Sequence, residues 1–164
     1  MKLKLNDQAP DFSLFDQTNK LHKLSNYLGK YVLLYFYPRD NTPGCTLEAC
    51  NLRDNWSEFD NLNVVVLGIS TDSIESHTKF ADKLQLLFPI LADDDKKVVQ
   101  LYGVWGEKKF IGRTYMGTNR MSFLIDPEGN IVKIYEKVKP AQHAREVLHD
   151  LQKLLPNNIV NISQ

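Results

Sequence analysis

The chain has 164 residues, of which 43% are hydrophobic, and its 20 basic and 20 acidic side chains give a formal net charge of zero. This length predicts one domain over residues 1–164, with a core large enough to fold without a disulfide. The balanced charge and the lack of a long Lys or Arg run argue against nucleic acid as a partner.

The first clear elements along the chain are two continuous apolar runs at residues 31–37 and 64–70. Such runs are typical of central strands covered on both faces, and we expect the two to lie side by side in one sheet. Between them, residues 46–59 carry apolar side chains at three-to-four-residue spacing, which predicts the crossover helix of a βαβ unit. Cys45 therefore lies at a strand-to-helix junction, where open α/β sheets usually bind ligands.

Strand and helix signals alternate almost to the end of the chain, without a linker or repeat, so the fold class is α/β. Ser73 is a suitable N-cap for the next helix. The residues at 103–106 are expected to be irregular. The remaining predicted elements are helices at 73–84, 95–101 and 140–155, and a β-hairpin formed by 121–126 and 131–135.

The residues after the first apolar run form a favourable helix start. Residues 42–45, Thr-Pro-Gly-Cys, fit the N-cap, N1, N2 and N3 positions, because Thr is a preferred cap and Pro tolerates N1. A thiol at N3 lies near unpaired backbone N–H groups and the positive end of the helix dipole, which favour the thiolate. The alternative is an ordinary helix start followed by a small buried side chain; a second cysteine nearby favours the reactive thiol.

Cys50 is the only other cysteine and follows Cys45 by five positions. In an unbroken helix their directions differ by about 140° and their Cα atoms lie more than ~8 Å apart. A disulfide needs Cα atoms within roughly 7 Å, so pairing requires the first helical turns to unwind. The spacing alone leaves a redox role and an ordinary buried position equally open for Cys50.

Two further features concern location and cofactors. Residues 1–7 lack the apolar core of a signal peptide, and no apolar stretch is long enough to span a bilayer, so we expect a cytoplasmic protein without membrane contact. Two cysteines in a reducing compartment suit catalysis, redox sensing or metal binding better than a permanent disulfide. Metal binding is the least favoured, because the four histidines lie far from Cys45 and the cysteine spacing is not Cys-x-x-Cys.

Several motifs together are characteristic of one family. Pro38, Thr42 and Cys45 form the pattern Pro-x-x-x-Thr-x-x-Cys, and Cys50 follows after a gap of four residues. In these residues the chain resembles the peroxiredoxins, and within them the bacterioferritin comigratory protein, or Q-type, subfamily. The resemblance covers nearly the whole chain, with further matching segments at residues 9–12, 68–72, 102–108 and 120–126.

The resemblance implies a thioredoxin-like fold, in which helices flank both faces of a central mixed β-sheet. It implies a thiol peroxidase that reduces hydrogen peroxide and alkyl hydroperoxides. Cys45 is then the peroxidatic residue that becomes a sulfenic acid, Thr42 hydrogen-bonds the peroxide and the sulfur, and Arg120 holds the thiolate and the polarised oxygen pair. Pro38 is expected to shape the loop and shield the site from water.

The resemblance also implies that Cys50 attacks the sulfenic acid of Cys45 and forms an intrachain disulfide. Thioredoxin is the expected reductant of this disulfide, with glutaredoxin or glutathione as alternatives. No metal, haem or flavin cofactor is required. We expect a monomer, because the larger dimer-based members of the family resolve the sulfenic acid with a distant cysteine on another subunit, usually near the C-terminus, and residues 161–164 include none. A dimer through another face stays open.

Two charged residues near this site have plainer interpretations. Arg120 precedes a predicted strand, where a solvated charge is common, but the resemblance favours the catalytic role. Glu48 lies one helical turn after Cys45. We expect it to be a carboxylate that only complements the helix dipole, with orientation of Arg120 as the alternative.

Two other functions fit the cysteine pair less well. A thiol-disulfide oxidoreductase uses Cys-x-x-Cys, which the chain lacks. A redox-sensing module would use the same disulfide switch to change partners, without sustained turnover, and this alternative stays open.

Overall fold

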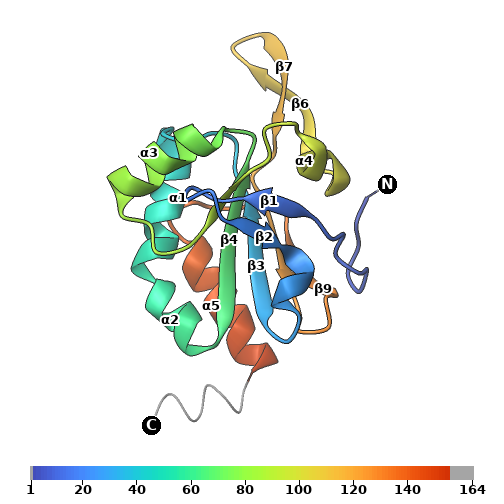
Figure 1. Cartoon of the computed structure of the whole chain (residues 1–164). Coiled ribbons are helices and arrows are strands. Elements are labelled where there is room, and N and C mark those ends of the chain that lie inside the picture. Colours follow the sequence, from blue (N-terminus) through green and yellow to red (C-terminus); the bar gives the residue numbers. More distant parts are fainter. Residues whose placement is uncertain (1, 156–164) are drawn as a thin grey trace.

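The computed structural model describes residues 2–155, and it contains a central five-stranded sheet with helices on both faces (Figure 1). The strand order is β5 (Ile90–Ala92), β4 (Val64–Ser70), β3 (Tyr31–Phe36), β8 (Met121–Ile125) and β9 (Ile131–Tyr135). β3, β4 and β5 are parallel, whereas β8 is antiparallel to β3 and to β9. The predicted mixed sheet is confirmed.

β3 and β4 lie side by side, as predicted, in a parallel register that begins at Tyr31 and Val64. Alternate side chains of β3 enter two different apolar cores, since Leu33 belongs to one and Leu34 to the other. Neither leucine has any exposed surface. This burial on both faces explains why the sequences of these strands are uninterrupted apolar runs.

Four helices share the core on one face of the sheet: α1 (Pro43–Asp54), α2 (Trp56–Asn61), α3 (Ile74–Leu84) and α5 (His143–Leu154). The other face is covered by α4 (Lys97–Leu101), the 3-10 helix η1 (Leu24–Tyr27) and the segment near Ala9 and Phe12. Among residues 2–155, every helix falls short of the length and apolar character that crossing a membrane requires.

The helix predicted at residues 46–59 is in fact two helices. α1 begins at Pro43 with Thr42 as its N-cap, and it ends at Asp54 with Asn55 as its C-cap. The side-chain Nδ2 of Asn55 donates to the carbonyl oxygen of Asn51 at 2.8 Å. In a continuous helix that carbonyl would accept the backbone N–H of Asn55, so the side chain competes with the helical hydrogen bond and the helix ends.

The C-terminal half of α1 is tied to two neighbouring helices. Asn51 accepts the backbone N–H of Ala144, in the first turn of α5, at 2.9 Å. Arg53 donates from Nη1 to the carbonyl oxygen of Leu84, at the end of α3, at 2.7 Å. This half of α1 is therefore fixed by side-chain contacts as well as by its own backbone.

The later elements agree with the prediction except at their ends. Ser73 is the N-cap of α3, and its Oγ accepts the backbone N–H of Ser76 at 3.1 Å. The helix predicted from residue 95 begins at Lys97, and the last helix begins at His143 rather than at Pro140. The predicted hairpin is confirmed as β8 and β9.

Two small antiparallel ribbons were not predicted: β1 (Ser13–Phe15) with β2 (Leu21–Lys23), and β6 (Trp105–Phe110) with β7 (Arg113–Thr118). The expectation of irregular structure at residues 103–106 is therefore wrong from Trp105 onward. The β6–β7 ribbon projects from the body of the protein, and most of its side chains are partly or fully exposed (Figure 1). Without a buried face, such strands lack the alternating pattern on which sequence prediction depends.

Gly68 allows the ring of the buried Tyr35 to lie against β4. A Cβ atom at Gly68 would be 2.8 Å from the ring of Tyr35. We expect Gly68→Ala to lower the free energy of unfolding by about 1–3 kcal/mol, because the added methyl group overpacks the core. Gly106→Ala is a matched control, since the nearest atom to its Cβ would be 3.7 Å away.

Urea denaturation of the two variants measures this difference. An unchanged denaturation midpoint for Gly68→Ala would mean that the Tyr35 ring shifts without loss of packing.

Candidate active site

Cys45, Thr42 and Arg120 come together at the carboxyl end of β3. The loop of residues 37–42 joins β3 to α1, and α1 carries Cys45 in its first turn. Arg120 immediately precedes β8, and the antiparallel pairing of Met121 with Phe36 brings it to the same end of β3. Three of the predicted site residues are therefore neighbours, although Cys45 and Arg120 are 75 positions apart in the chain.

The guanidinium group of Arg120 contacts the sulfur of Cys45. Its Nη2 lies 3.4 Å from Sγ, and only 1% of Cys45 is exposed. The sulfur also belongs to the first turn of α1, where backbone N–H groups have no partner within the helix. The guanidinium and the helix N-terminus both favour negative charge on this sulfur. The alternative interpretation of Arg120 as a solvated strand-end charge is wrong, since its side chain is only 20% exposed.

Thr42 occupies the N-cap position but does not cap the helix with its side chain. Its Oγ1 donates instead to the backbone carbonyl oxygen of Arg39 at 2.9 Å. With its hydrogen directed at Arg39, the hydroxyl oxygen keeps its lone pairs for another donor. Thr42 therefore presents an oriented hydrogen-bond acceptor beside the first turn of α1.

Gly44 is required for the approach of Arg120 to the helix start. A Cβ atom at this position would lie 2.9 Å from Nη2 of Arg120, the same nitrogen that contacts Cys45. From the sequence Gly44 was only the N2 residue of a helix. Its contribution comes from a contact with a distant segment, which the local sequence does not reveal.

Glu48 is not the exposed carboxylate that we expected. Its side chain has no exposed surface, and Oε1 lies 2.6 Å from Nη1 of Arg120. Within residues 2–155, its Oε2 has no hydrogen-bond partner. Burial raises the pKa of Glu48 to about 7, and the nearby Arg120 opposes this rise. Glu48 thus holds Arg120 from the side opposite the sulfur, as the less favoured interpretation proposed.

Arg120 keeps its charge in this arrangement. Burial lowers the pKa of Arg120, but the adjacent Cys45 and Glu48 outweigh burial, and the net effect is a raised pKa. A second cation, Lys108 on β6, donates to the carbonyl oxygen of Thr118 at 3.0 Å. Burial and the charge of Arg120 lower the pKa of Lys108, while Cys45 acts in the opposite direction. The sulfur therefore lies in the field of two cations, only one of which was predicted.

Cys50 lies in the same continuous helix as Cys45, and both are free thiols. It is partly buried and packs against the core on that face of the sheet. Because α1 is unbroken from Pro43 to Asp54, the two sulfurs cannot pair in this conformation. Pro38 lies in the loop after β3 and is half-buried. The shielding role of Pro38 and the redox role of Cys50 stay predictions.

The sequence matches the AhpC/TSA family over residues 5–134. Among curated proteins, it is 48% identical over 151 residues to Peroxiredoxin Bcp of Escherichia coli K12, an alignment that covers 92% of this chain and 97% of the relative. It is 45% identical over 154 residues to Peroxiredoxin Bcp of Bacillus subtilis, covering 94% of this chain and 98% of the relative.

Solved structures give the same result. The bacterioferritin comigratory protein of Xanthomonas campestris matches with a TM-score of 0.84 and 35% identity, over 92% of this chain and 96% of that chain. A cysteine-to-serine mutant of Xylella fastidiosa PrxQ matches with a TM-score of 0.88 and 32% identity, over 93% of this chain and 98% of that chain. The thioredoxin-like fold is therefore confirmed.

The buried Glu48 predicts a specific pH dependence of stability. Its pKa is about 7 in the folded protein, against an ordinary value of 4.5, so at pH 5 to 7 the folded state retains a proton that the unfolded chain releases. The contribution of Glu48 to stability therefore falls as pH rises through this window. Relative to the unmodified chain, Glu48→Gln should gain roughly 2–3 kcal/mol in free energy of unfolding between pH 5 and pH 8.

Urea denaturation of both proteins at several pH values, with the thiols kept reduced, measures this shift. Titrating groups remote from Glu48, Arg120 and Cys45 are shared and cancel in the difference. A difference that stays constant across the pH range would show that Glu48 titrates like an exposed carboxylate.

Proposed function

The chain belongs to the AhpC/TSA family as a peroxiredoxin, that is, a thiol peroxidase, and we propose that Cys45 is the residue that attacks the peroxide. The observation that carries this proposal is the 3.4 Å contact between Arg120 Nη2 and the buried Sγ of Cys45. Peroxide reduction by a thiolate needs a nucleophile, a fixed cation and oriented hydrogen-bonding groups in one place. Cys45, Arg120 and Thr42 supply these.

In the first step, the thiolate of Cys45 attacks one oxygen of the peroxide, an S–O bond forms and the O–O bond breaks. The electron pair of the broken bond leaves with the second oxygen, which takes up the proton that the thiol had released and departs as water or an alcohol. Cys45 becomes a sulfenic acid. Arg120 stabilises the negative charge as it moves from sulfur to the leaving oxygen. The attacked oxygen keeps its hydrogen and donates it in a hydrogen bond to the hydroxyl oxygen of Thr42.

In the second step, the thiol of Cys50 attacks the sulfur of the sulfenic acid. An S–S bond forms, the S–O bond breaks, and the hydroxyl group leaves with the thiol proton as water. The first turns of α1 unwind for this step, since a disulfide needs Cα atoms within roughly 7 Å. The disulfide closes within one chain, so catalysis requires no second copy, and we propose a monomer.

We propose hydrogen peroxide and alkyl hydroperoxides as substrates and thioredoxin as the reductant, with glutaredoxin or glutathione as alternatives. The solved relative from Xanthomonas campestris is described by its alkyl peroxide reduction activity, which supports the organic substrates. A disulfide joining two cysteines of one unwound segment is a suitable target for a dithiol protein. A thiol pair that is returned to the reduced state in each cycle suits the cytoplasm.

The first test follows the mass of the intact chain after a slight molar excess of hydrogen peroxide. The reduced protein should lose two hydrogens rapidly, with both thiols blocked against alkylation, whereas Cys45→Ser should show no such loss and no turnover. Full peroxidase activity in Cys45→Ser would refute the assignment.

Sustained turnover with thioredoxin and its reductase separates an enzyme from a redox sensor, which would give one oxidation event and little flux.

The second test concerns Cys50. Cys50→Ser should still form a sulfenic acid at Cys45 but should lose rapid recycling by thioredoxin, because no partner thiol traps the sulfenic acid. Over-oxidation to the sulfinic acid should become easier. These products differ in mass by whole oxygen atoms, so intact-mass analysis resolves them. A species of twice the chain mass less two hydrogens in Cys50→Ser would mean that a disulfide forms between chains.

A further inference from the structure

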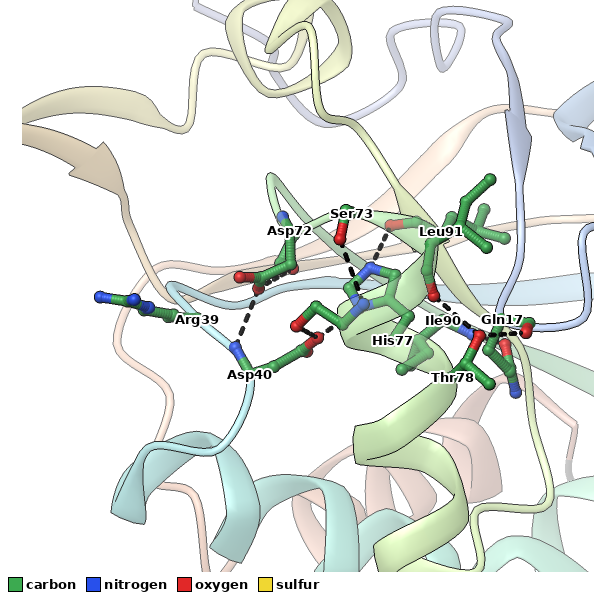
Figure 2. Close-up of polar contacts among 12 residues, drawn as sticks. Gln17, Arg39, Asp40, Asp72, Ser73, His77, Thr78, Ile90 and Leu91 are labelled. Carbon is green, nitrogen blue, oxygen red and sulfur yellow. Dashed lines mark hydrogen bonds and ion pairs between the residues drawn. The ribbon is translucent and has the colours of Figure 1, made fainter.

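Asp40 is a buried carboxylate in the loop between β3 and α1, two residues before Thr42. Its side chain is 3% exposed. Three groups surround it. The hydroxyl of Tyr37 donates to Oδ1 at 2.7 Å, and the hydroxyl of Ser76 donates to Oδ2 at 2.8 Å. Nδ1 of His77 lies 2.6 Å from Oδ2 (Figure 2). Ser76 and His77 both belong to α3, whose Lys83 also donates to the side chain of Asn41 at 2.9 Å, so the loop is attached to this helix at more than one point.

His77 joins the loop to β5 through both of its ring nitrogens. Its Nε2 lies 3.0 Å from the backbone carbonyl oxygen of Leu91, which can only accept, so Nε2 carries a hydrogen. Its Nδ1 is the hydrogen-bond partner of Asp40, whose oxygens also accept from two hydroxyls. His77 has no exposed surface. The loop is therefore held by a buried hydrogen bond between Asp40 and His77, and a buried polar group that loses its partner is costly.

The part of α3 that carries His77 is itself firmly held. Thr78, the next residue, donates to the carbonyl oxygen of Gln17 at 2.7 Å, and the side chain of Gln17 accepts the backbone N–H of Ile90 at 2.9 Å (Figure 2). Through Leu91, His77 is also bonded to β5. The Asp40–His77 hydrogen bond thus connects the loop to a helix and a strand of the fold rather than to another loop.

The peptide group between Arg39 and Asp40 links this network to the active site. Its N–H donates to Oδ2 of Asp72 at 2.9 Å, and its carbonyl oxygen accepts the hydroxyl hydrogen of Thr42 at 2.9 Å. Asp72 is fixed in turn by the hydroxyl of Ser70 at 2.6 Å. Any rotation of this peptide group moves the acceptor of the Thr42 hydrogen, and with it the direction of the lone pairs that Thr42 presents.

We propose that Asp40 and His77 are positioning residues for peroxide reduction: their hydrogen bond fixes the Arg39–Asp40 peptide group, which orients the hydroxyl of Thr42 and holds the start of α1 beside Arg120. This inference rests on the proposed role of Cys45. The hydrogen bond serves the attack on peroxide, which needs the folded loop, and it does not serve disulfide formation, which needs α1 to unwind. Its loss therefore slows the first step and spares the second.

The test uses two substitutions, each of which keeps a hydrogen-bond donor near only one of the two ring nitrogens of His77. Asn places its amide nitrogen near the position of Nδ1, facing Asp40, whereas Gln places its amide nitrogen near the position of Nε2, facing Leu91. His77→Gln should slow sulfenic acid formation roughly tenfold or more, because the loop loses its partner and Thr42 its orientation. His77→Asn should keep most of the rate. Neither variant should slow disulfide formation.

The two steps are measured separately by stopped-flow kinetics with hydrogen peroxide. Sulfenic acid formation is followed in the Cys50→Ser background, and disulfide formation in the chain that retains both cysteines. The matched controls are His22→Gln and His22→Asn. His22, on β2, is a buried histidine with its Nε2 2.7 Å from Oδ2 of Asp16, which directly follows β1, and neither side chain is hydrogen-bonded to the loop of residues 37–42. Both controls should lose stability without a change in either rate.

Ser76→Ala provides a milder variant in case His77→Gln does not fold. It removes one donor to Asp40 without leaving a buried charge unpaired, and it should slow the same step in the same direction. Unchanged sulfenic acid formation in Ser76→Ala and the His77 variants would overturn the proposal, as would equal losses in His77→Asn and His77→Gln or a matching loss in the His22 controls. Failure of the proposed function itself would be distinct, because the unmodified chain would then form no sulfenic acid at Cys45.

Discussion

One guanidinium group lies between two buried groups that both attract it, the sulfur of Cys45 and the carboxyl of Glu48. If both were ionised, Arg120 alone would not neutralise them, and the burial of Glu48 adds a further penalty for its charge. Burial raises the pKa of Glu48 to about 7, and Arg120 opposes this rise. One guanidinium group therefore serves both partners, with Nη1 on the carboxyl of Glu48 and Nη2 on the sulfur of Cys45.

The surrounding structure places this guanidinium accurately. The β3–β8 pairing brings Arg120 to the end of β3, and the missing side chain of Gly44 lets it reach the first turn of α1. Asp40 holds the loop in place through its hydrogen bond to His77 of α3. Arg120 and His77 come from segments that are distant in the sequence from Cys45, and both meet α1 or the loop before it. The helix start at residues 42–45 is therefore determined by the local sequence, whereas the rest of the site is assembled around it by tertiary contacts.

This division explains which features could be predicted from the sequence. The strands β3 and β4, the Ser73 cap and the helix start at Thr42 depend on residues close together in the chain, and they were predicted correctly. Arg120 was found only through the family resemblance. Glu48 and His77 look like ordinary polar helix residues, and their burial depends on which segment packs against them. The β6–β7 ribbon was missed because its exposed faces leave no hydrophobic period.

The side-chain ties in the second half of α1 divide that helix into two cooperative units. Everything from Asn51 onward is anchored to α5 and α3, and the helix ends at Asn55. Unwinding that brings Cys45 to Cys50 therefore has a natural stopping point directly after the second cysteine. In the proposed cycle, the six residues from Cys45 to Cys50 rearrange, and Cys45 and Ala49 leave the core that they share with α2, α3 and α5. Each proposed cycle then opens a short section of the protein and closes it again, and the packing that this section gives up sets the free-energy cost of the step.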